Sequence, residues 1–336
     1  MRLAALVIAL LFCSCESLME GEGDCRVVYK VKFRFTRNIL DADAFPSKVG
    51  SVSLFVFDKQ GRCIETLTES GAALAEENYA MVLDLPAGTY DLIAWCGLDG
   101  NDDFALADAL NPQTKDDLIC SLRPGSRAGA ECRKPLSALW HGLADNVVLP
   151  ADTYGEVVVE TIYLTKDTNT VRIILQHFKG NELDPDDFGF TITDDNGIMN
   201  WDNSLLPCDT ITYREYSKIP AQVAMPDADR ESGDKTAVSS LLAEIDVARL
   251  VSEGGHKSSI LTVSRVGAEK PVVRLPLTDL LLMAKGEIRK DMDDQEYLDR
   301  QDEYNVILFL DDAGWYINGG VWINSWHIRD FTLNYN

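Results

Sequence analysis

The feature that most constrains the fold is an alternation of apolar and mostly basic residues in "RVVYKVKFRFT", residues 26–36. A period of two places alternate side chains on opposite faces of an extended strand, whereas a helix would need a period of about 3.6 residues. The basic residues between the apolar ones, Lys30, Lys32 and Arg34, suit a solvent-exposed face. Residues 26–36 are therefore predicted to form a half-buried first strand, with Val27, Tyr29, Val31, Phe33 and Phe35 on its buried face.

Short segments of the same kind recur along the chain, with turn-forming residues between many of them. Many short strands at regular spacing indicate an all-β fold built from sandwiches. Helical periodicity is scarce and is confined to residues 237–246 and 277–285. Asn196 and Gly197 are predicted to form a hairpin turn, because both tolerate positive φ. The further predicted strands are residues 51–58, 78–85, 89–97, 155–164, 168–178, 188–193, 258–263, 304–311, 321–326 and 330–335.

The chain of 336 residues is long enough for two domains, each with a core of its own. It is predicted to divide near the polar stretch "TKDTN", residues 165–169. We expect an N-terminal β-sandwich in residues 26–165 and a C-terminal β-sandwich in residues 166–336.

The N-terminus carries the one apolar run that could enter a membrane. Leu3 to Phe12 is ten residues long, which is too short to span a bilayer and indicates a signal peptide over residues 1–14. The run ends in "LLFCSC", which resembles a bacterial lipobox with Cys15 as the acylated residue. Cys13 fits less well, because bulky Phe12 precedes it. The alternative is plain cleavage without a lipid.

Residues 15–25 are rich in Glu and Gly and are predicted to form a flexible acidic tether. An acidic stretch after the lipidated cysteine resembles the export signal of surface lipoproteins in bacteria of the Bacteroidetes type. The alternative is a solvated spacer without an addressing role. Two or three long acyl chains, such as palmitate, would hold the protein on the outer membrane, because each buried methylene contributes about 0.8 kcal/mol.

Charge and residue patterns exclude several functions. The formal net charge of −23 argues against nucleic acid, whose phosphates require clustered basic side chains. The four histidines lie outside the spacings typical of metal sites, and residues 99–110 lack the glycine and glutamate of a calcium loop. We predict no enzyme activity, cofactor or metal. A hydrolase has only the abundance of Asp and Glu in its favour.

The cysteines leave the disulfides open, because six of them beyond the lipobox allow 15 pairings. Cys120 and Cys132 flank one loop and are the favoured pair. Cys96 lies in an apolar predicted strand and is expected to pack there.

Several stretches together resemble the FimB-type fimbrial anchor family of type V pili, the minor subunits that accompany fimbrillins. The more specific of them are "YLDRQDEYNVILFLDD" and the "INSW" that follows. The resemblance implies two transthyretin-like, Ig-like Greek-key β-sandwich domains in tandem and an N-terminal lipid. The other stretches are residues 45–61, 77–98, 163–175 and 320–329.

The resemblance also implies a structural role, in which a fimbrillin donates a strand to a groove of its neighbour. That groove opens when a protease removes the recipient's first strand after an arginine. Arg37 follows the predicted first strand here, and a cut after it would also release Cys15 and its lipid. We therefore expect an anchor that stays uncut, keeps its own groove filled and ends the fimbria at the outer membrane, with a fimbrillin as partner.

The sequence leaves two interpretations of the segment that would contact the fimbrillin. The C-terminal "WHIRDFTLNYN" is a candidate donor strand with Ile328, Phe331 and Leu333 as apolar contacts, or else the final strand of the second sandwich. The alternative function is a surface glycan-binding lipoprotein, for which an exposed row of aromatic side chains beside a groove would be expected.

Overall fold

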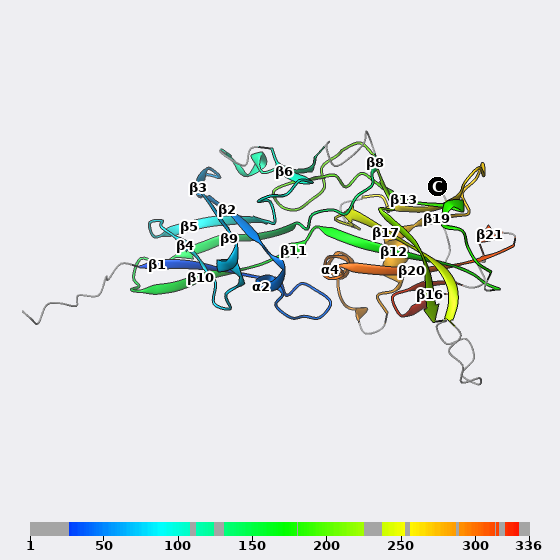
Figure 1. The fold of residues 1–336 in the computed structure, drawn as a ribbon. Coiled ribbons are helices and arrows are strands. Elements are labelled where there is room, and N and C mark those ends of the chain that lie inside the picture. Colours follow the sequence, from blue (N-terminus) through cyan, green and yellow to red (C-terminus); the bar gives the residue numbers. More distant parts are fainter. Residues whose placement is uncertain are drawn as a thin grey trace, which may run out of the picture.

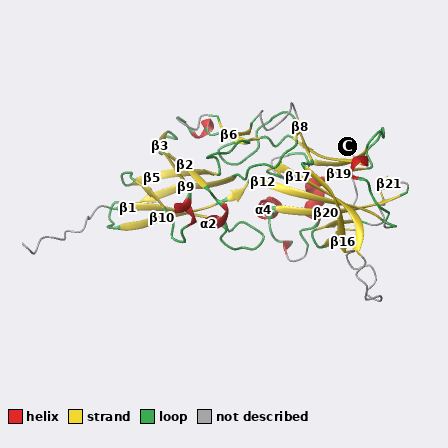
Figure 2. Ribbon diagram, in the orientation of Figure 1, coloured by secondary structure: helices red, strands yellow, loops and turns green. Residues whose placement is uncertain are grey.

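The computed structural model describes nine stretches of the chain. Within them nearly all regular structure is β, in two sandwiches that lie end to end (Figure 1), and the helices are few and short (Figure 2). This confirms the predicted all-β class with two sandwiches in tandem. The helices of the described part are all too short or too polar to cross a membrane. The described stretches are residues 27–107, 112–123, 131–179, 181–224, 237–252, 256–286, 289–312, 314–315 and 320–328.

The first sandwich consists of a sheet of three strands and a sheet of five strands. The small sheet has the order β10-β1-β4, with β10 at Glu156–Tyr163, β1 at Val28–Arg34 and β4 at Met81–Leu83. The larger sheet has the order β11 (Thr165–Lys166), β9 (Trp140–Leu149), β5 (Gly88–Cys96), β2 (Ser51–Phe57) and β3 (Cys63–Ser70). Their inner faces bury one apolar core, over which lie helix α2 (Phe45–Lys48) and the 3₁₀ turn Ala72–Ala75.

The second sandwich pairs a sheet of seven strands with a sheet of five. The larger sheet has the order β16 (Ser217–Ala224), β17 (Ala237–Ala248), β12 (Thr168–His177), β20 (Glu303–Asp311), β22 (Val321–Ile323) and β23 (Trp326–Ile328). Strand β21 (Gly314–Trp315) also pairs with β20. The smaller follows the order β19-β18-β13-β15-β8: Val273–Pro276, Ile260–Arg265, Phe188–Asp194, Ile211–Arg214 and Glu131–Cys132. Its helices are α3 (Leu277–Met283) and α4 (Asp294–Arg300), with a 3₁₀ turn at Pro185–Asp187.

The segment between β5 and β9 joins the two sandwiches. Strand β8 runs parallel to β15 of the second sandwich, with Cys132 opposite Tyr213. A third small sheet has the order β14-β7-β6, at Ile198–Met199, Cys120–Leu122 and Phe104–Leu106, and the 3₁₀ turn Lys115–Asp117 precedes β7. The larger apolar core therefore takes side chains from both halves of the sequence. The domain boundary near residue 165 stays a prediction.

The predicted helix over residues 237–246 is wrong, because these residues lie in strand β17. Leu241, Ala243, Ile245 and Val247 are buried at a period of two. Strand β17 pairs with β12 on one side and with β16 on the other, so its backbone groups bond to neighbouring strands and not within a helix. The second predicted helix is confirmed, since α3 covers Leu277–Met283.

The hairpin turn predicted at Asn196 and Gly197 is also wrong. Neither residue has a positive φ, and the segment connects β13 to β14, which pair with different strands. Asn196 is instead fully buried. Its amide donates to the carbonyls of Ala248 and Arg249 at 3.1 and 3.0 Å, and its oxygen accepts from Tyr213 at 2.7 Å. Asn196 thus ties the loop to the core through its side chain.

The cysteine pair favoured by the sequence is not bridged. Cys120 and Cys132 are both free thiols buried in strands β7 and β8. Burial raises the pKa of each thiol, so both behave as small apolar side chains. Cys96 is buried in β5, as expected.

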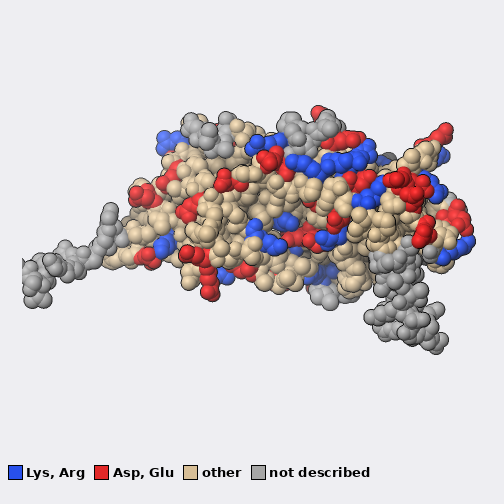
Figure 3. Space-filling model, in the orientation of Figure 1, with Lys and Arg blue, Asp and Glu red and all other residues tan. Residues whose placement is uncertain are grey.

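The large negative net charge is spread over the surface. On the face in Figure 3, acidic and basic side chains are interspersed over both sandwiches. Such mixing favours solubility and disfavours non-specific adhesion.

Candidate functional site

The first strand is the middle strand of its sheet. Strand β1 runs parallel to β10, with Val28 opposite Glu156 and Arg34 opposite Tyr163. On its other side it runs antiparallel to β4, where Tyr29–Val31 lies opposite Met81–Leu83. Both sides of β1 therefore bond to neighbouring strands, so the strand is part of the sheet (Figure 1).

The inward side chains of this segment form part of the first core. Tyr29, Val31, Phe33 and Phe35 are all at most 5% exposed, and Val27 is half-buried. The Phe33 ring stacks on Phe45 with centroids 5.9 Å apart. The Tyr29 hydroxyl donates to the carbonyl of Pro150 at 2.7 Å, so its polar end is also satisfied. Removal of the strand would expose the floor of an apolar groove.

The chain then closes into a compact loop, residues 36–44, called here the Arg37 loop. The amide of Ala44 donates to the Phe35 carbonyl at 3.0 Å and closes the base. Asn38 is 8% exposed, and its side-chain amide donates to the carbonyls of Phe35 and Ala42 at 2.7 and 2.6 Å. Its oxygen accepts from the Leu40 amide at 3.1 Å. One buried asparagine therefore holds both sides of the loop.

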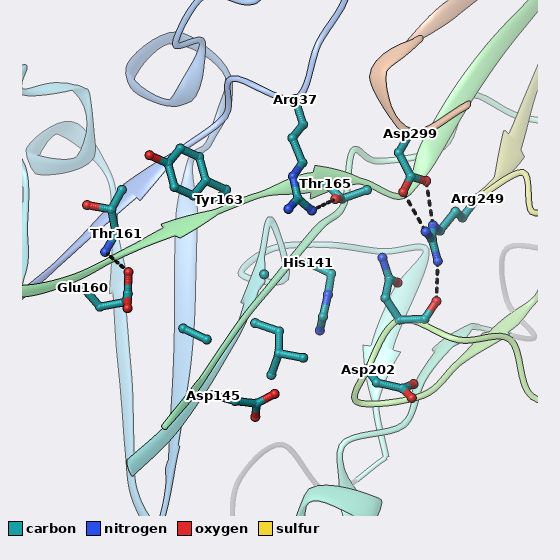
Figure 4. A pocket seen from close by; sticks show the side chains of 14 residues that line it. Arg37, His141, Asp145, Glu160, Thr161, Tyr163, Thr165, Asp202, Arg249 and Asp299 are labelled. Atoms are coloured by element: carbon teal, nitrogen blue, oxygen red, sulfur yellow. Dashed lines mark hydrogen bonds and ion pairs between the residues drawn. The ribbon is translucent and has the colours of Figure 1, made fainter. Parts of the chain in front are cut away.

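The side chain of Arg37 lines a cavity of about 500 Å³ where the two sandwiches meet (Figure 4). Its guanidinium donates to the hydroxyl of Thr165 in β11 at 3.2 Å. The cavity walls come from β9, β10 and β11, from the loop after β14, and from the second sandwich. The other lining residues are His141, Gly142, Leu143, Ala144, Asp145, Glu160, Thr161, Tyr163, Asp202, Asn203, Arg249 and Asp299.

A buried charge cluster lies at one end of this cavity. Arg249 donates to both carboxyl oxygens of Asp299, at 3.0 and 2.8 Å, and to the carbonyl of Asn203 at 2.5 Å. Asp167, between β11 and β12, is fully buried with one carboxyl oxygen 3.8 Å from Arg249. Asn203 donates to the same oxygen at 2.8 Å. The cluster links α4 and the residue after β17 to the connection between the sandwiches.

Burial dominates the protonation of two groups near the cavity. It raises the pKa of Asp167 to about 7, although Arg249 and the hydrogen bond from Asn203 act in the opposite direction. The second oxygen of Asp167 has no hydrogen-bond partner within the described part of the chain. Burial also lowers the pKa of His141 to about 4, so this imidazole is neutral and donates to the Trp201 carbonyl at 2.8 Å.

Asp194, Asp195 and His256 form the one group of potential metal ligands among the described residues. The two ring nitrogens of His256 face different carboxylates, Asp194 at 2.7 Å and Asp195 at 3.4 Å. The hydrogen bond with Asp194 raises the pKa of His256 and favours the imidazolium, in which both nitrogens carry protons. A proton competes with a metal for such a histidine, and the geometry is that of an ion pair.

The other predicted residues lie elsewhere. Ile328 lies in β23 opposite Val321 and is 9% exposed, so it packs into the second sandwich. Cys15, Phe331 and Leu333 lie outside the described residues. The sequence reasoning missed Asn38, Asp167 and Arg249, because single polar residues next to predicted strands carry no periodic signal.

Comparison with known proteins decides the family. The model of the fimbrillin-A associated anchor proteins Mfa1 and Mfa2 matches residues 22–331. The chain belongs to this anchor family. This membership confirms the expected relationship to fimbrial anchors and associates the chain with the cell surface and with fimbrial subunits.

Solved structures show how far the likeness extends. A candidate adhesin of Bacteroides thetaiotaomicron is 31% identical over 92% of this chain and 99% of its own, with a TM-score of 0.79. A second protein of that organism, described as a candidate polysaccharide-binding protein, is 31% identical over 91% of this chain and 99% of its own, with a TM-score of 0.75. The fimbrial anchor Mfa2 of Porphyromonas gingivalis shares the fold at 16% identity over 91% and 100%, with a TM-score of 0.65. No curated protein matches the chain.

Proposed function

We propose that this member of the anchor family is a non-enzymatic outer-membrane lipoprotein that ends a fimbria at the cell surface and supports adhesion. In this proposal Cys15 carries the lipid, and a fimbrillin is the partner. An anchor of this kind must keep its first strand, because a cut after Arg37 would release both the strand and the lipid.

One observation carries the proposal, namely that β1 is bonded on both sides and buries its inward side chains. A partner strand that entered between β10 and β4 would first have to displace β1. Displacement would cost the sum of many backbone hydrogen bonds, each worth about 0.5–1.5 kcal/mol net, together with the apolar burial. A subunit with this strand in place has its own groove filled, which suits the last subunit of a polymer.

The donor contact is assigned to the C-terminal residues after β23, with Phe331 and Leu333 as its apolar side chains. Ile328 is buried in β23, so its side chain is not proposed as part of this contact. Deletion of residues 330–336 should abolish capture of fimbrillin without releasing the protein from the membrane. Unchanged capture would assign the contact to another surface.

The test of the whole proposal uses protein from an outer-membrane fraction. Fatty-acid labelling should mark wild type and leave Cys15→Ser unmarked, while Cys13→Ser remains marked as a matched control. The N-terminal residue of the cell-bound protein should be Cys15, and fimbrillin should co-purify with it. Cell-bound protein that begins at Asn38, or an unlabelled wild type, would contradict the proposal.

A glycan-binding lipoprotein is the second candidate, since one relative at 31% identity is described as a candidate polysaccharide-binding protein. The tryptophans of the described part give it little support. Trp140 is buried in the core of the first sandwich and Trp95 in the larger core, and the most exposed tryptophan of the described part, Trp326 in β23, is 44% exposed. Binding on a glycan array would favour this candidate over the anchor.

A further inference from the structure

We propose that the second sandwich clamps the Arg37 loop and thereby protects the Arg37–Asn38 bond from arginine-specific proteases. The clamp consists of Arg300 in α4, Arg289 just before α4, and Asp41 in the loop. This inference rests on the proposed function, in which the chain is not cut after Arg37. The clamp is the contact that prevents this cut.

The clamp holds the loop backbone on both sides of the bond. Arg300 donates to the Thr36 carbonyl at 3.4 Å, one residue before Arg37. Arg289 donates to the Ile39 carbonyl at 3.4 Å, one residue after Asn38. Arg300 also forms an ion pair with Asp41 at 2.6 Å. The contacts come from residues about 250 positions away in the sequence, so only the folded second sandwich supplies them.

The two residues of the bond are themselves engaged. Arg37 is exposed and lies along the cavity wall with its guanidinium on Thr165, whereas an arginine-specific protease would need that side chain in its own pocket. Asn38 is buried and makes three hydrogen bonds inside the loop. Asp41 has a φ of 51°, so the chain turns sharply just beyond the bond.

A protease must therefore open the loop before it can cut. When opening and closing are faster than cleavage, the rate of cutting follows the population of the open loop. Loss of Arg300 removes one ion pair and one backbone contact, which should raise that population. A fimbrial subunit whose second domain lacks such arginines would expose the equivalent loop, so the clamp would separate an uncut anchor from a subunit that is processed.

The experiment uses full-length protein extracted in detergent and treated with an arginine-specific protease. Formation of the Asn38 N-terminus is followed over time by mass spectrometry. Arg300→Ala and Asp41→Asn should each raise its rate about fivefold over wild type, the upper range for a partly exposed ion pair. The double variant should add little, because both changes break the same pair. Asn at position 41 tolerates the positive φ, so the second variant removes charge without backbone strain.

Asp294→Asn is the matched control, because Asp294 lies in α4 and pairs with Lys285 at 2.8 Å, away from both Arg300 and the loop. Its cutting rate should equal that of wild type. The clamp is refuted if Arg300→Ala and Asp41→Asn resist as wild type does, or if Asp294→Asn is cut as fast as they are. Thermal unfolding of each variant identifies general destabilisation. An intact lipidated N-terminus on cells together with a failed clamp leaves the proposed function standing, whereas cell-bound protein that starts at Asn38 removes both.

Discussion

At the scale of single residues, Asp167 between the sandwiches links the stability of the protein to pH. Asp167 faces Arg249 and Asn203, yet burial outweighs both partners and raises its pKa to about 7. Arg249 makes two bonds to Asp299, neither of which involves Asp167. The carboxyl of Asp167 is therefore costly in its ionised form, which is the form that the unfolded chain adopts above its ordinary pKa of 3.8.

Asp167→Asn should stabilise the protein at high pH. Between pH 4 and 7 the folded state retains a proton that the unfolded state releases, so the free energy of unfolding of wild type falls as pH rises through this interval. The variant lacks this contribution. It should match wild type near pH 4 and exceed it at pH 8 by on the order of 2–4 kcal/mol. Urea unfolding at both pH values measures the difference, and parallel pH profiles would contradict the prediction.

At the scale of elements, strand β1 is stabilised chiefly through its inward face. Phe33 stacks on Phe45 and lies 6.3 Å from Tyr79, centroid to centroid. Lys32 is on the opposite face and is half-buried. The two positions are adjacent in sequence, but Phe33 faces the core and Lys32 does not. A comparison of substitutions at the two positions therefore measures how much core packing stabilises strand β1.

Phe33→Ala should destabilise the protein by about 3–5 kcal/mol, the range for removal of a buried aromatic side chain. Lys32→Ala, the matched control, should change the free energy of unfolding by less than about 0.5 kcal/mol. The measurement is the midpoint of urea unfolding at constant slope. Equal small effects at both positions would show that β1 is not held by the first core.

At the scale of the whole molecule, the two sandwiches share structure. Residues before β9 supply β8 to a sheet of the second sandwich, and Phe104 and Leu122 lie in the larger core. The Arg249 cluster and the clamp add polar links between the halves. Neither half is expected to be complete without the other.

The protein should therefore unfold in one cooperative transition. Calorimetry of the full chain should give a calorimetric enthalpy equal to the van't Hoff enthalpy, because the shared core and the shared sheet couple the halves. Residues 27–165 expressed alone should expose the apolar faces of β6 and β7 and aggregate. Two separate transitions, or a soluble folded fragment, would show that the sandwiches are independent.

Local residue patterns were enough to predict the class of the fold and the buried face of the first strand. A period of two is a local property, and residues 26–36 carry it without interruption. The family resemblance also followed from stretches of sequence alone.

Tertiary structure decided the rest, because the deciding contacts join residues that are far apart in sequence. Residues 237–248 became a strand because β12 and β16 pair on either side, which outweighs a helical pattern. Asn196 became a buried link because Tyr213 and two carbonyls surround it. The positions of Arg37 beside Thr165 and of Asp41 beside Arg300 likewise depend on how the sandwiches meet, and no local pattern encodes that geometry.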